Sequence, residues 1–439
     1  MLVSNRESEF SKVLNTGDVL VVAFGAMIGW GWVVSSGQWI TSGGVLGTVL
    51  GFIIGGIMIY FVGLCYAELT TAMPKCGGEH VFSYKAFGSI GAYICTWSII
   101  LSYIGVVCYE AVSFPTILQY VFPKIARGYL YSVGGFDIYF TWLLIAIGMA
   151  LLILFLNIIG MKKAARFQKI LTCVIAAVGI ALVAGAAYSG NVNNLQNQLL
   201  VGDTNGEIIQ NIAKVAIMTP FFLFGFDVIP QAAEEINVPL KKLGKMMILS
   251  IIMAVSFYVL VVLAVGYVMN AEQIKTSMLS ATGLVTADAM GVAFNNANMA
   301  KVLIIGGLCG IVTSWNSFLI GGSRALYSMS VSYMLPRKFA VLHKKYNTPV
   351  NSLLLIGALS VISPFFGRSM LVWIVDAGNF ACCFAYCIVS LSFIVLRRKE
   401  ADMRRPYKVK HYKFVGIVAV IMSGTMSAMY IIPETNCTL

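Results

Sequence analysis

The chain has little charge and no long polar segment. Asp, Glu, Lys and Arg make up only 11% of its 439 residues, and 59% of the residues are hydrophobic. Soluble globular proteins carry about 25% charged residues. The shortage of charge therefore excludes an ordinary soluble domain, and the long apolar runs predict a polytopic membrane protein.

Side chains that catalyse reactions are also scarce. The three histidines, His80, His343 and His411, all fall in predicted loops, whereas a membrane enzyme needs clustered His, Asp or Cys at membrane depth. The chain has no nucleotide-binding loop, which argues against ATP-driven transport by a single chain. The ten cysteines follow no metal or disulfide spacing and are interpreted as free thiols. We therefore predict no enzymatic activity, no cofactor and no metal centre.

Eleven apolar segments are long enough to cross a bilayer. Their approximate limits are 16–40, 44–70, 90–118, 138–159, 168–188, 211–236, 244–269, 301–330, 350–367, 370–396 and 413–433. The predicted fold is an all-α polytopic membrane protein. The loops at 189–210 and 270–300 are polar or mildly amphipathic, and neither is predicted to form a folded domain.

The formal charge of +12 is explained by topology. With the N-terminus in the cytoplasm, most Lys and Arg residues fall in cytoplasmic loops, as the positive-inside rule requires. A soluble protein with this charge would suggest nucleic acid as a partner, but here the distribution excludes it. We predict a multi-pass protein of the cell membrane with a cytoplasmic N-terminus and the lipid bilayer as its surroundings.

Glycines interrupt the first apolar segment. Gly25, Gly29 and Gly31 lie in the run Gly25-Ala26-Met27-Ile28-Gly29-Trp30-Gly31-Trp32. Glycine favours unwinding of a helix, and an unwound backbone in hydrocarbon is tolerated only where protein or a water-filled cavity satisfies its polar groups. The run predicts a broken helix beside a polar site. The alternative is that the glycines only allow close helix packing.

The sixth segment carries a second interruption. Pro220 and Pro230 flank Gly225 and Asp227; proline removes a helix N–H, and a charged residue at this depth costs at least about 2.5 kcal/mol. The alternative is an ordinary proline kink. The two interruptions occupy corresponding positions in two five-helix halves, about 16–188 and 211–396, with one further helix at about 413–433. Matching breaks in inverted repeats are typical of secondary transporters.

Several stretches of the chain resemble the amino acid–polyamine–organocation (APC) superfamily of permeases. They span residues 17 to about 350, and the motif at the inner end of the second segment is the most specific. The stretches are Gly25-Ala26-Met27-Ile28-Gly29-Trp30-Gly31, Tyr66-Ala67-Glu68-Leu69 with Pro74-Lys75-Cys76-Gly77-Gly78-Glu79, Asn157 and Gly160 with Gln168 and Thr172, Gly225-Phe226-Asp227 with Glu234-Glu235, and Gly322-Ser323-Arg324-Ala325-Leu326-Tyr327. The resemblance implies a single transmembrane transporter domain over residues 1–439 and twelve helices, one more than the eleven seen.

The resemblance also implies roles for residues at both breaks. A substrate carboxylate would face Trp30 and Gly31, and an amine would face the carbonyls of Met27, Phe221 and Phe224. Five more residues at the two breaks are added to the predicted substrate-binding residues because of their position: Ile28, Gly29, Gly225, Phe226 and Asp227. Phe221 matches the gating aromatic of the family, and Trp315 and Phe318 are further gating or coupling candidates.

Two intramembrane carboxylates, Asp227 and Glu110, are functional candidates by default. Asp227 could neutralise a substrate amine, take a coupling proton or cap the inner half-helix, and Glu110 could act in the site or lie in a wet outer vestibule. Ile175 occupies the position at which proton-coupled members of the family often carry a lysine. This difference argues against proton coupling through that lysine. Thr313 and Ser314 are weak sodium candidates, since such residues more often bond to their own helix.

We therefore predict a secondary active or exchange transporter that moves an amino acid across the cell membrane by alternating access. The alternative is a transporter of a cationic amine, such as a polyamine or ethanolamine-like compound, because two carboxylates without a basic neighbour in sequence favour it. A channel is less favoured, since no continuous polar helix face is visible. The expected partners are a small-molecule substrate, the bilayer and a coupling proton.

Overall fold

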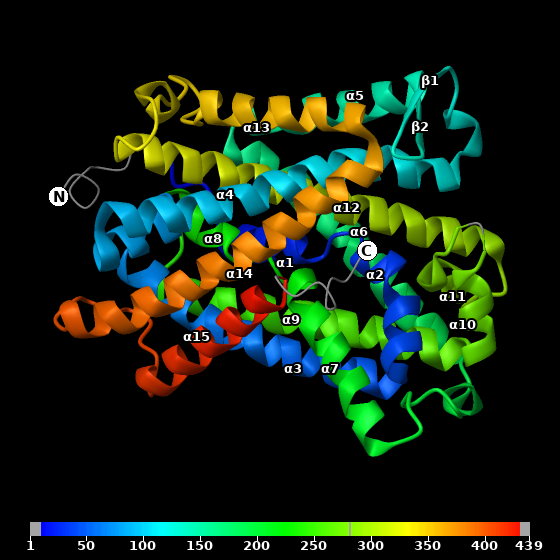
Figure 1. Cartoon of the computed structure of the whole chain (residues 1–439). Helices are drawn as coiled ribbons and strands as arrows, with labels where there is room; N and C mark the ends of the chain where they lie inside the picture. The colour runs from blue at the N-terminus through cyan, green and yellow to red at the C-terminus, as the bar shows by residue number, and fades with distance from the viewer. Residues whose placement is uncertain (1–9, 281, 431–439) are drawn as a thin grey trace.

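The computed structural model describes residues 10–280 and 282–430, with only the backbone described at 368–373 and 375. Helices make up most of this part of the chain (Figure 1). The α-helices are α1 Thr16–Met27, α2 Gly31–Val34, α3 Ser36–Ala72, α4 Glu79–Val121, α5 Phe140–Ile158, α6 Met161–Ser189, α7 Asn205–Phe222, α8 Val228–Gln231, α9 Leu240–Val268, α10 Ala271–Met278, α11 Val285–Ala293, α12 Ala297–Val331, α13 Val350–Ile362, α14 Gly367–Lys399 and α15 Tyr412–Met429. The strands are β1 Tyr129–Val133 and β2 Phe136–Tyr139, and short 3-10 turns include η3 Ala233–Glu235.

The long helices lie roughly along one direction and give the bundle two distinct ends (Figure 1). The β1–β2 hairpin, α10 and α11 lie at one end, which we call the hairpin end. The start of α4 and the connection between α14 and α15 lie at the opposite end. We call it the basic end because the last turn of α14 carries Arg397 and Arg398 and the connection carries Arg404 and Arg405.

The prediction of an all-α polytopic membrane protein is confirmed. Within the described residues, eight helices are long and apolar enough to cross a membrane: α3, α4, α5, α6, α9, α12, α15 and residues 376–399 of α14. The other three predicted segments are built from shorter pieces, namely α1 with α2, α7 with α8, and α13 with the turn that follows it. The inverted relation between the two halves stays a prediction.

Two long helices change direction at glycine. Gly44 divides α3 with φ 78° and ψ 170°, and Gly88 divides α4 with φ 77° and ψ −162°. Only glycine adopts such angles without strain. The part of α3 before Gly44 therefore belongs to the first predicted segment, and the part after it forms the second.

The loops are more structured than the sequence analysis expected. Residues 129–139 form an antiparallel hairpin whose turn contains Gly134 and Gly135, both with positive φ. The 270–300 loop holds α10 and α11, and α10 starts with a capping box in which Asn270 and Gln273 bond to each other's backbone N–H. Paired glycines between β-prone residues and an Asn-x-x-Gln cap are local signals that specify these elements.

Buried amides hold four helices together in the interior. Gln168 on α6 donates to the carbonyl of Thr313 (3.0 Å) and to Ser317 Oγ (2.9 Å) on α12, and accepts from Asn316 (2.7 Å). Asn157 on α5 donates to Asn316 Oδ1 (2.8 Å), and Ser317 donates to the carbonyl of Val22 on α1 (3.2 Å). Hydrogen bonds between buried polar groups fix the relative positions of these helices.

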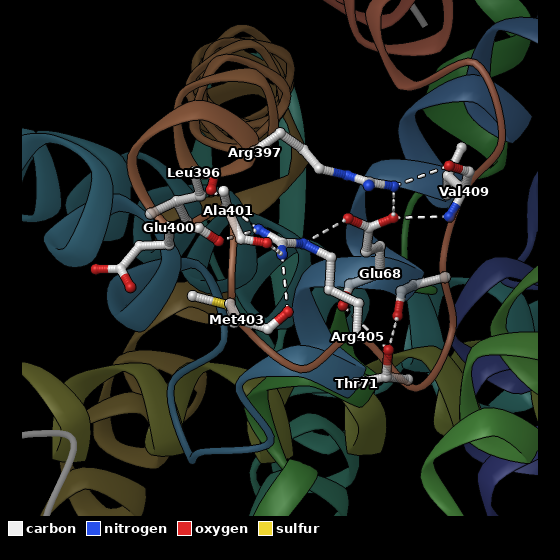
Figure 2. A network of polar contacts seen from close by, with 10 residues as sticks. Glu68, Thr71, Leu396, Arg397, Glu400, Ala401, Met403, Arg405 and Val409 are labelled. Atoms are coloured by element: carbon white, nitrogen blue, oxygen red, sulfur yellow. Dashed lines mark hydrogen bonds and ion pairs between the residues drawn. The ribbon is translucent and has the colours of Figure 1, made fainter.

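A buried carboxylate fastens the α14–α15 connection to α3 (Figure 2). Glu68 is 1% exposed and forms ion pairs with Arg397 (2.6 Å) and Arg405 (3.1 Å). It also accepts from the backbone N–H of Val409 (2.7 Å). The guanidinium of Arg405 additionally donates to carbonyls of its own loop, so the network in Figure 2 holds the loop closed on itself and on α3.

Candidate functional site

The first break separates α1 from α2. The α1 helix ends at Met27, Ile28 has non-helical angles (φ −101°, ψ 79°), and α2 begins at Gly31. The N–H groups of Gly29, Trp30 and Gly31 have no acceptor among the described residues. Unpaired N–H groups of this kind favour an anion or a carboxylate.

The second break separates α7 from α8, between Phe222 and Val228. Gly225 has φ 127°, which only glycine adopts readily. A Cβ at Gly225 would lie 2.6 Å from Cβ of Ala26 and 3.1 Å from N of Met27. Glycine is therefore required here both by the backbone angle and by direct packing of the second break against the first.

No donor among the described residues reaches the carbonyls of Phe221 and Phe224. The carbonyl of Met27 is already used, because the hydroxyl of Tyr258 on α9 donates to it at 3.0 Å. The two breaks thus bring unpaired N–H groups of one chain segment close to unpaired carbonyls of another. Such a pair of surfaces is complementary to a small molecule that carries both a negative and a positive charge.

A cavity lies between the breaks, and aromatic side chains make up much of its lining. Its lining residues come from α1, the first break, α2 and the residue that follows it, α4, α7, the second break, α9 and α12. They are Ala26, Met27, Gly29, Trp30, Gly31, Val34, Ser35, Val106, Tyr109, Glu110, Phe221, Phe222, Phe224, Tyr258, Ser314 and Phe318. A second, smaller hollow shares Trp30, Val34 and Tyr109 with it and reaches Leu284 at the hairpin end.

The structure brings most of the predicted site residues to this cavity and leaves others behind its wall. The predicted residues that line it are Met27, Gly29, Trp30, Gly31, Phe221, Phe224, Glu110, Phe318 and Ser314. The predicted residues outside the lining are Ile28, Gly225, Phe226, Asp227, Trp315 and Thr313. Ile28, Phe226, Asp227 and Thr313 are fully buried, and Trp315 is 1% exposed.

Glu110 is the one acidic side chain in the lining. It is 5% exposed, and a Cβ at Gly29 would lie 3.3 Å from its Oε1 and 3.7 Å from Cβ of Ser314. Its Oε2 has no hydrogen-bond partner among the described residues. No Lys, Arg or His lines the cavity in that part of the chain, so Glu110 faces the cavity without a cationic partner.

Asp227 lies behind the second break and is held by three donors. The hydroxyls of Tyr103 and Tyr386 donate to it at 2.5 Å and 2.9 Å, and the N–H of Gly225 donates at 2.9 Å. Its carboxylate therefore shapes the break and joins it to α4 and α14, rather than reaching the cavity. The sequence could not distinguish this position from that of Glu110, since both are single acids in apolar runs.

Aromatic rings form the wall opposite Glu110. The rings of Phe221 and Phe222 lie 4.9 Å apart, edge to face, and Phe222 also packs against Trp39 at 4.7 Å. Phe221 is only partly buried, whereas Phe222 is 8% exposed. Phe221 is thus the aromatic side chain of this pair with more freedom to move over the cavity.

Sequence reasoning did not name seven residues of the lining as site residues: Ala26, Val34, Ser35, Val106, Tyr109, Phe222 and Tyr258. The Tyr258 hydroxyl in the middle of a mainly apolar span was a readable signal, because a buried phenol needs a partner. Tyr109 adjoins Glu110 in the chain and could have been included with it. The apolar residues give no such signal, because their place in the cavity depends on packing.

Thr313 and Ser314 do not form a cation site as placed. The hydroxyl of Thr313 donates to the carbonyl of Gly310 on its own helix at 2.9 Å, which is the common behaviour of such residues. Ser314 turns toward the cavity and Glu110. The two side chains therefore point to different places: Thr313 bonds to its own helix, and Ser314 faces the cavity.

Polar contacts close the bundle between the cavity and the basic end. Arg324 on α12 is fully buried and pairs with Glu235 through two contacts, at 2.8 Å and 3.3 Å. The backbone of Glu235 accepts from the N–H groups of Val13 and Leu14. The amide of Gln231 on α8 donates to Glu79 at the start of α4. These contacts join the segment before α1, α8, α4 and α12 at one level of the bundle.

Comparison with known proteins agrees with this architecture. A family model described as amino acid permease matches residues 14–438. The branched-chain amino acid permease BcaP of Bacillus subtilis is 26% identical over 92% of this chain and 84% of its own length. The methylthioribose transporter of Bacillus subtilis is 24% identical (98% and 90%), and the histidine permease HisP of Lactococcus lactis is 23% identical (96% and 88%). The chain belongs to the amino acid permease family, whose members are membrane transporters.

Proposed function

We propose that this protein carries an amino acid across the cell membrane by alternating access, and that the cavity between the two breaks is its binding site. The observation that carries the proposal is the pairing of unpaired N–H groups at Gly29, Trp30 and Gly31 with unpaired carbonyls at Phe221 and Phe224. The N–H groups suit the α-carboxylate and the carbonyls suit the α-ammonium. The aromatic wall accommodates an apolar side chain.

The two ends of the bundle support an alternating mechanism. The smaller hollow extends the cavity toward the hairpin end, whereas the Arg324–Glu235 ion pair and the Glu79–Gln231 hydrogen bond close the other end. Movement of α1 and α8 away from α4 and α12 would open that end. Breaks at the middle of two helices allow such movement, because the half-helices are separately hinged.

A thermal-shift screen tests the substrate class. A ligand that binds only the folded protein raises its apparent unfolding temperature. Purified protein screened against the standard amino acids, polyamines, ethanolamine and methylthioribose is expected to respond to one or a few amino acids. The responding compound should then show saturable uptake and trans-stimulation in proteoliposomes. A response to amines or methylthioribose alone would contradict the proposal.

Glu110 favours a second candidate, a cationic amine or a basic amino acid. It is a carboxylate in the lining without a cationic partner among the described residues. If a substrate cation pairs with it, loss of the charge removes one partner of a buried pair, which costs about 3–5 kcal/mol. If the substrate is a zwitterion with a neutral side chain, the carbonyls of the second break already meet its amine.

Neutralising the two acids separates these candidates. For a neutral amino acid we expect Glu110→Gln to lower affinity by less than about tenfold, or about 1.4 kcal/mol, and Asp227→Asn to lower it less still, since Asp227 does not reach the cavity. The measurement is ligand affinity of both variants between pH 5 and 8. Collapse of binding at every pH in Glu110→Gln would contradict the neutral substrate and favour the cation.

We place the basic end in the cytoplasm, following the positive-inside rule. Asn205, at the start of α7, and Lys410, in the α14–α15 connection, are both exposed. In a background without the native cysteines, Asn205→Cys is expected to react with a membrane-impermeant maleimide added to intact cells, and Lys410→Cys only after lysis. Labelling of Lys410→Cys from outside would contradict this orientation.

A further inference from the structure

Glu79 occupies the layer that closes the basic end, and no basic side chain pairs with it among the described residues. It is fully buried at the first position of α4. The Nε2 of Gln231 on α8 donates to its Oε2, and its Oε1 has no hydrogen-bond partner among the described residues. The carboxyl group of Glu79 is therefore held by a single side-chain amide, that of Gln231.

The titratable groups around Glu79 are acids, phenols and thiols. Its amide partner Gln231 lies on α8, whose N-cap residue is Asp227, and the ring of Tyr66 on α3 packs against the rings of Phe226 and Tyr386. Cys95 on α4 is also near, and Tyr386 on α14 links Tyr66 to Asp227 by ring contact and hydrogen bond.

The basic side chains of this region have other partners. His80 bonds to Thr96 (3.0 Å) and Ser332 (2.7 Å), and Arg324 pairs with Glu235. No ion pair reaches Glu79 or Asp227 within the described residues. Glu79 and Asp227 are both fully buried, and burying two carboxylates without a cation is costly, so a bound proton that removes one of the charges stabilises this layer.

Hydrogen bonding indicates which of the two carboxyls holds it. Asp227 accepts from two hydroxyls and one backbone N–H, which together satisfy a carboxylate. Glu79 has a single amide partner, and an amide side chain can present either its N–H₂ or its oxygen. Gln231 can thus donate to an ionised Glu79 or, after rotation, accept from a protonated one. The Oε1 of Gln231 is itself without a donor among the described residues.

The position of Glu79 connects this proton to opening of the basic end. Gln231 also accepts, through its backbone carbonyl, from the N–H of Gly77 (3.2 Å), and a Cβ at Gly78 would lie 2.5 Å from Cβ of Pro230. The start of α4 therefore packs directly on α8. Because α8 follows the second break, separation of α4 from α8 and rearrangement of the cavity wall belong to the same movement.

We propose that Glu79, held by Gln231 beside Asp227, is the proton-binding site that couples this transporter to a proton gradient. The proton enters from the outer medium, binds to a Glu79 carboxyl oxygen and neutralises the closing layer. It leaves to the cytoplasm when the basic end opens and water reaches the carboxyl. This proposal deepens the proposed function and rests on it.

Proteoliposomes containing the full-length protein and an internal pH dye provide the test, with the membrane potential held at zero. A mixture of the standard L-amino acids at matched pH is added outside. For the wild type we expect acidification of the lumen on addition. With a gradient of about one pH unit, acid outside, we expect up to about tenfold accumulation of radiolabelled amino acids when one proton accompanies each molecule.

Glu79→Gln is expected to abolish acidification and accumulation, while exchange of labelled for unlabelled amino acids across the membrane continues, because glutamine resembles the protonated acid. Glu400→Gln removes an exposed carboxyl whose partner, Lys85, lies 3.4 Å away, and is expected to retain all three activities.

Accumulation by Glu79→Gln at the wild-type level would overturn the proton site. Amino acid transport by the wild type without any acidification would also overturn it, whether or not the variant folds. Absence of every form of amino acid transport in the wild type would instead contradict the proposed function.

Discussion

Gly31→Val is expected to lower substrate affinity at least about a hundredfold, equivalent to about 2.8 kcal/mol. A Cβ at Gly31 would collide with the ring of Phe222, the side chain that packs between Phe221 and Trp39 in the cavity wall. The new side chain would push this ring out of place and cover the N–H groups of the first break. The displaced ring changes the cavity wall, and the covered N–H groups can no longer bind the substrate carboxylate.

The same substitution should leave the fold intact. Gly31 begins α2 and does not appear among the residues with positive φ, so valine costs only the modest helix penalty of a β-branched residue. The atom that it meets belongs to a side chain that can rotate. Gly148→Val is a matched control, because nothing lies within 4 Å of a Cβ at Gly148 on α5. Wild-type affinity in a folded Gly31→Val protein would exclude the first break from the site.

Glu68→Ala is expected to lower the free energy of unfolding by about 3–5 kcal/mol, because it leaves buried guanidinium groups without their counter-ion. Arg397 and Arg405 are 9% and 6% exposed and meet at this carboxylate. Their remaining acceptors are backbone carbonyls (Figure 2). The effect should appear as a lower apparent unfolding temperature of the purified protein, with the α14–α15 connection becoming accessible to protease.

Two further variants identify the cause. Glu68→Gln keeps the volume of the side chain and is expected to lose most of the same stability, since the charge is what the arginines require. Glu400→Ala removes an exposed carboxylate 3.4 Å from Lys85 and should cost at most about 1 kcal/mol. Equal unfolding temperatures for Glu68→Ala and the wild type would show that the network in Figure 2 does not stabilise the bundle.

The positions of the two breaks could be predicted because their causes are local. Glycine at 29, 31 and 225 favours unwinding, and the structure ends α1 and α7 close to these positions, whereas Pro220 and Pro230 lie within α7 and α8. The hairpin at 129–139 has an equally local cause in Gly134 and Gly135, and the sequence analysis overlooked it.

The functions of the acids could not be predicted, because they depend on partners that are distant in sequence. Gln231 meets Glu79 from 152 positions away, and Tyr386 meets Asp227 from 159 positions away. The sequence favoured Asp227 as a site residue and named Glu79 only as part of a motif. Folding places Glu110 in the cavity, Asp227 behind its wall and Glu79 in the closing layer.

The most direct measurement is an electron cryo-microscopy structure of the protein with a bound amino acid, chosen from the thermal-shift screen. The central claim is that the paired breaks form the substrate site. It predicts ligand density in the cavity, with the carboxylate within about 3.2 Å of the N–H groups of Trp30 and Gly31 and the ammonium facing the carbonyls of Phe221 and Phe224. An ordered amino acid bound elsewhere, with this cavity filled by side chains or water alone, would contradict the claim.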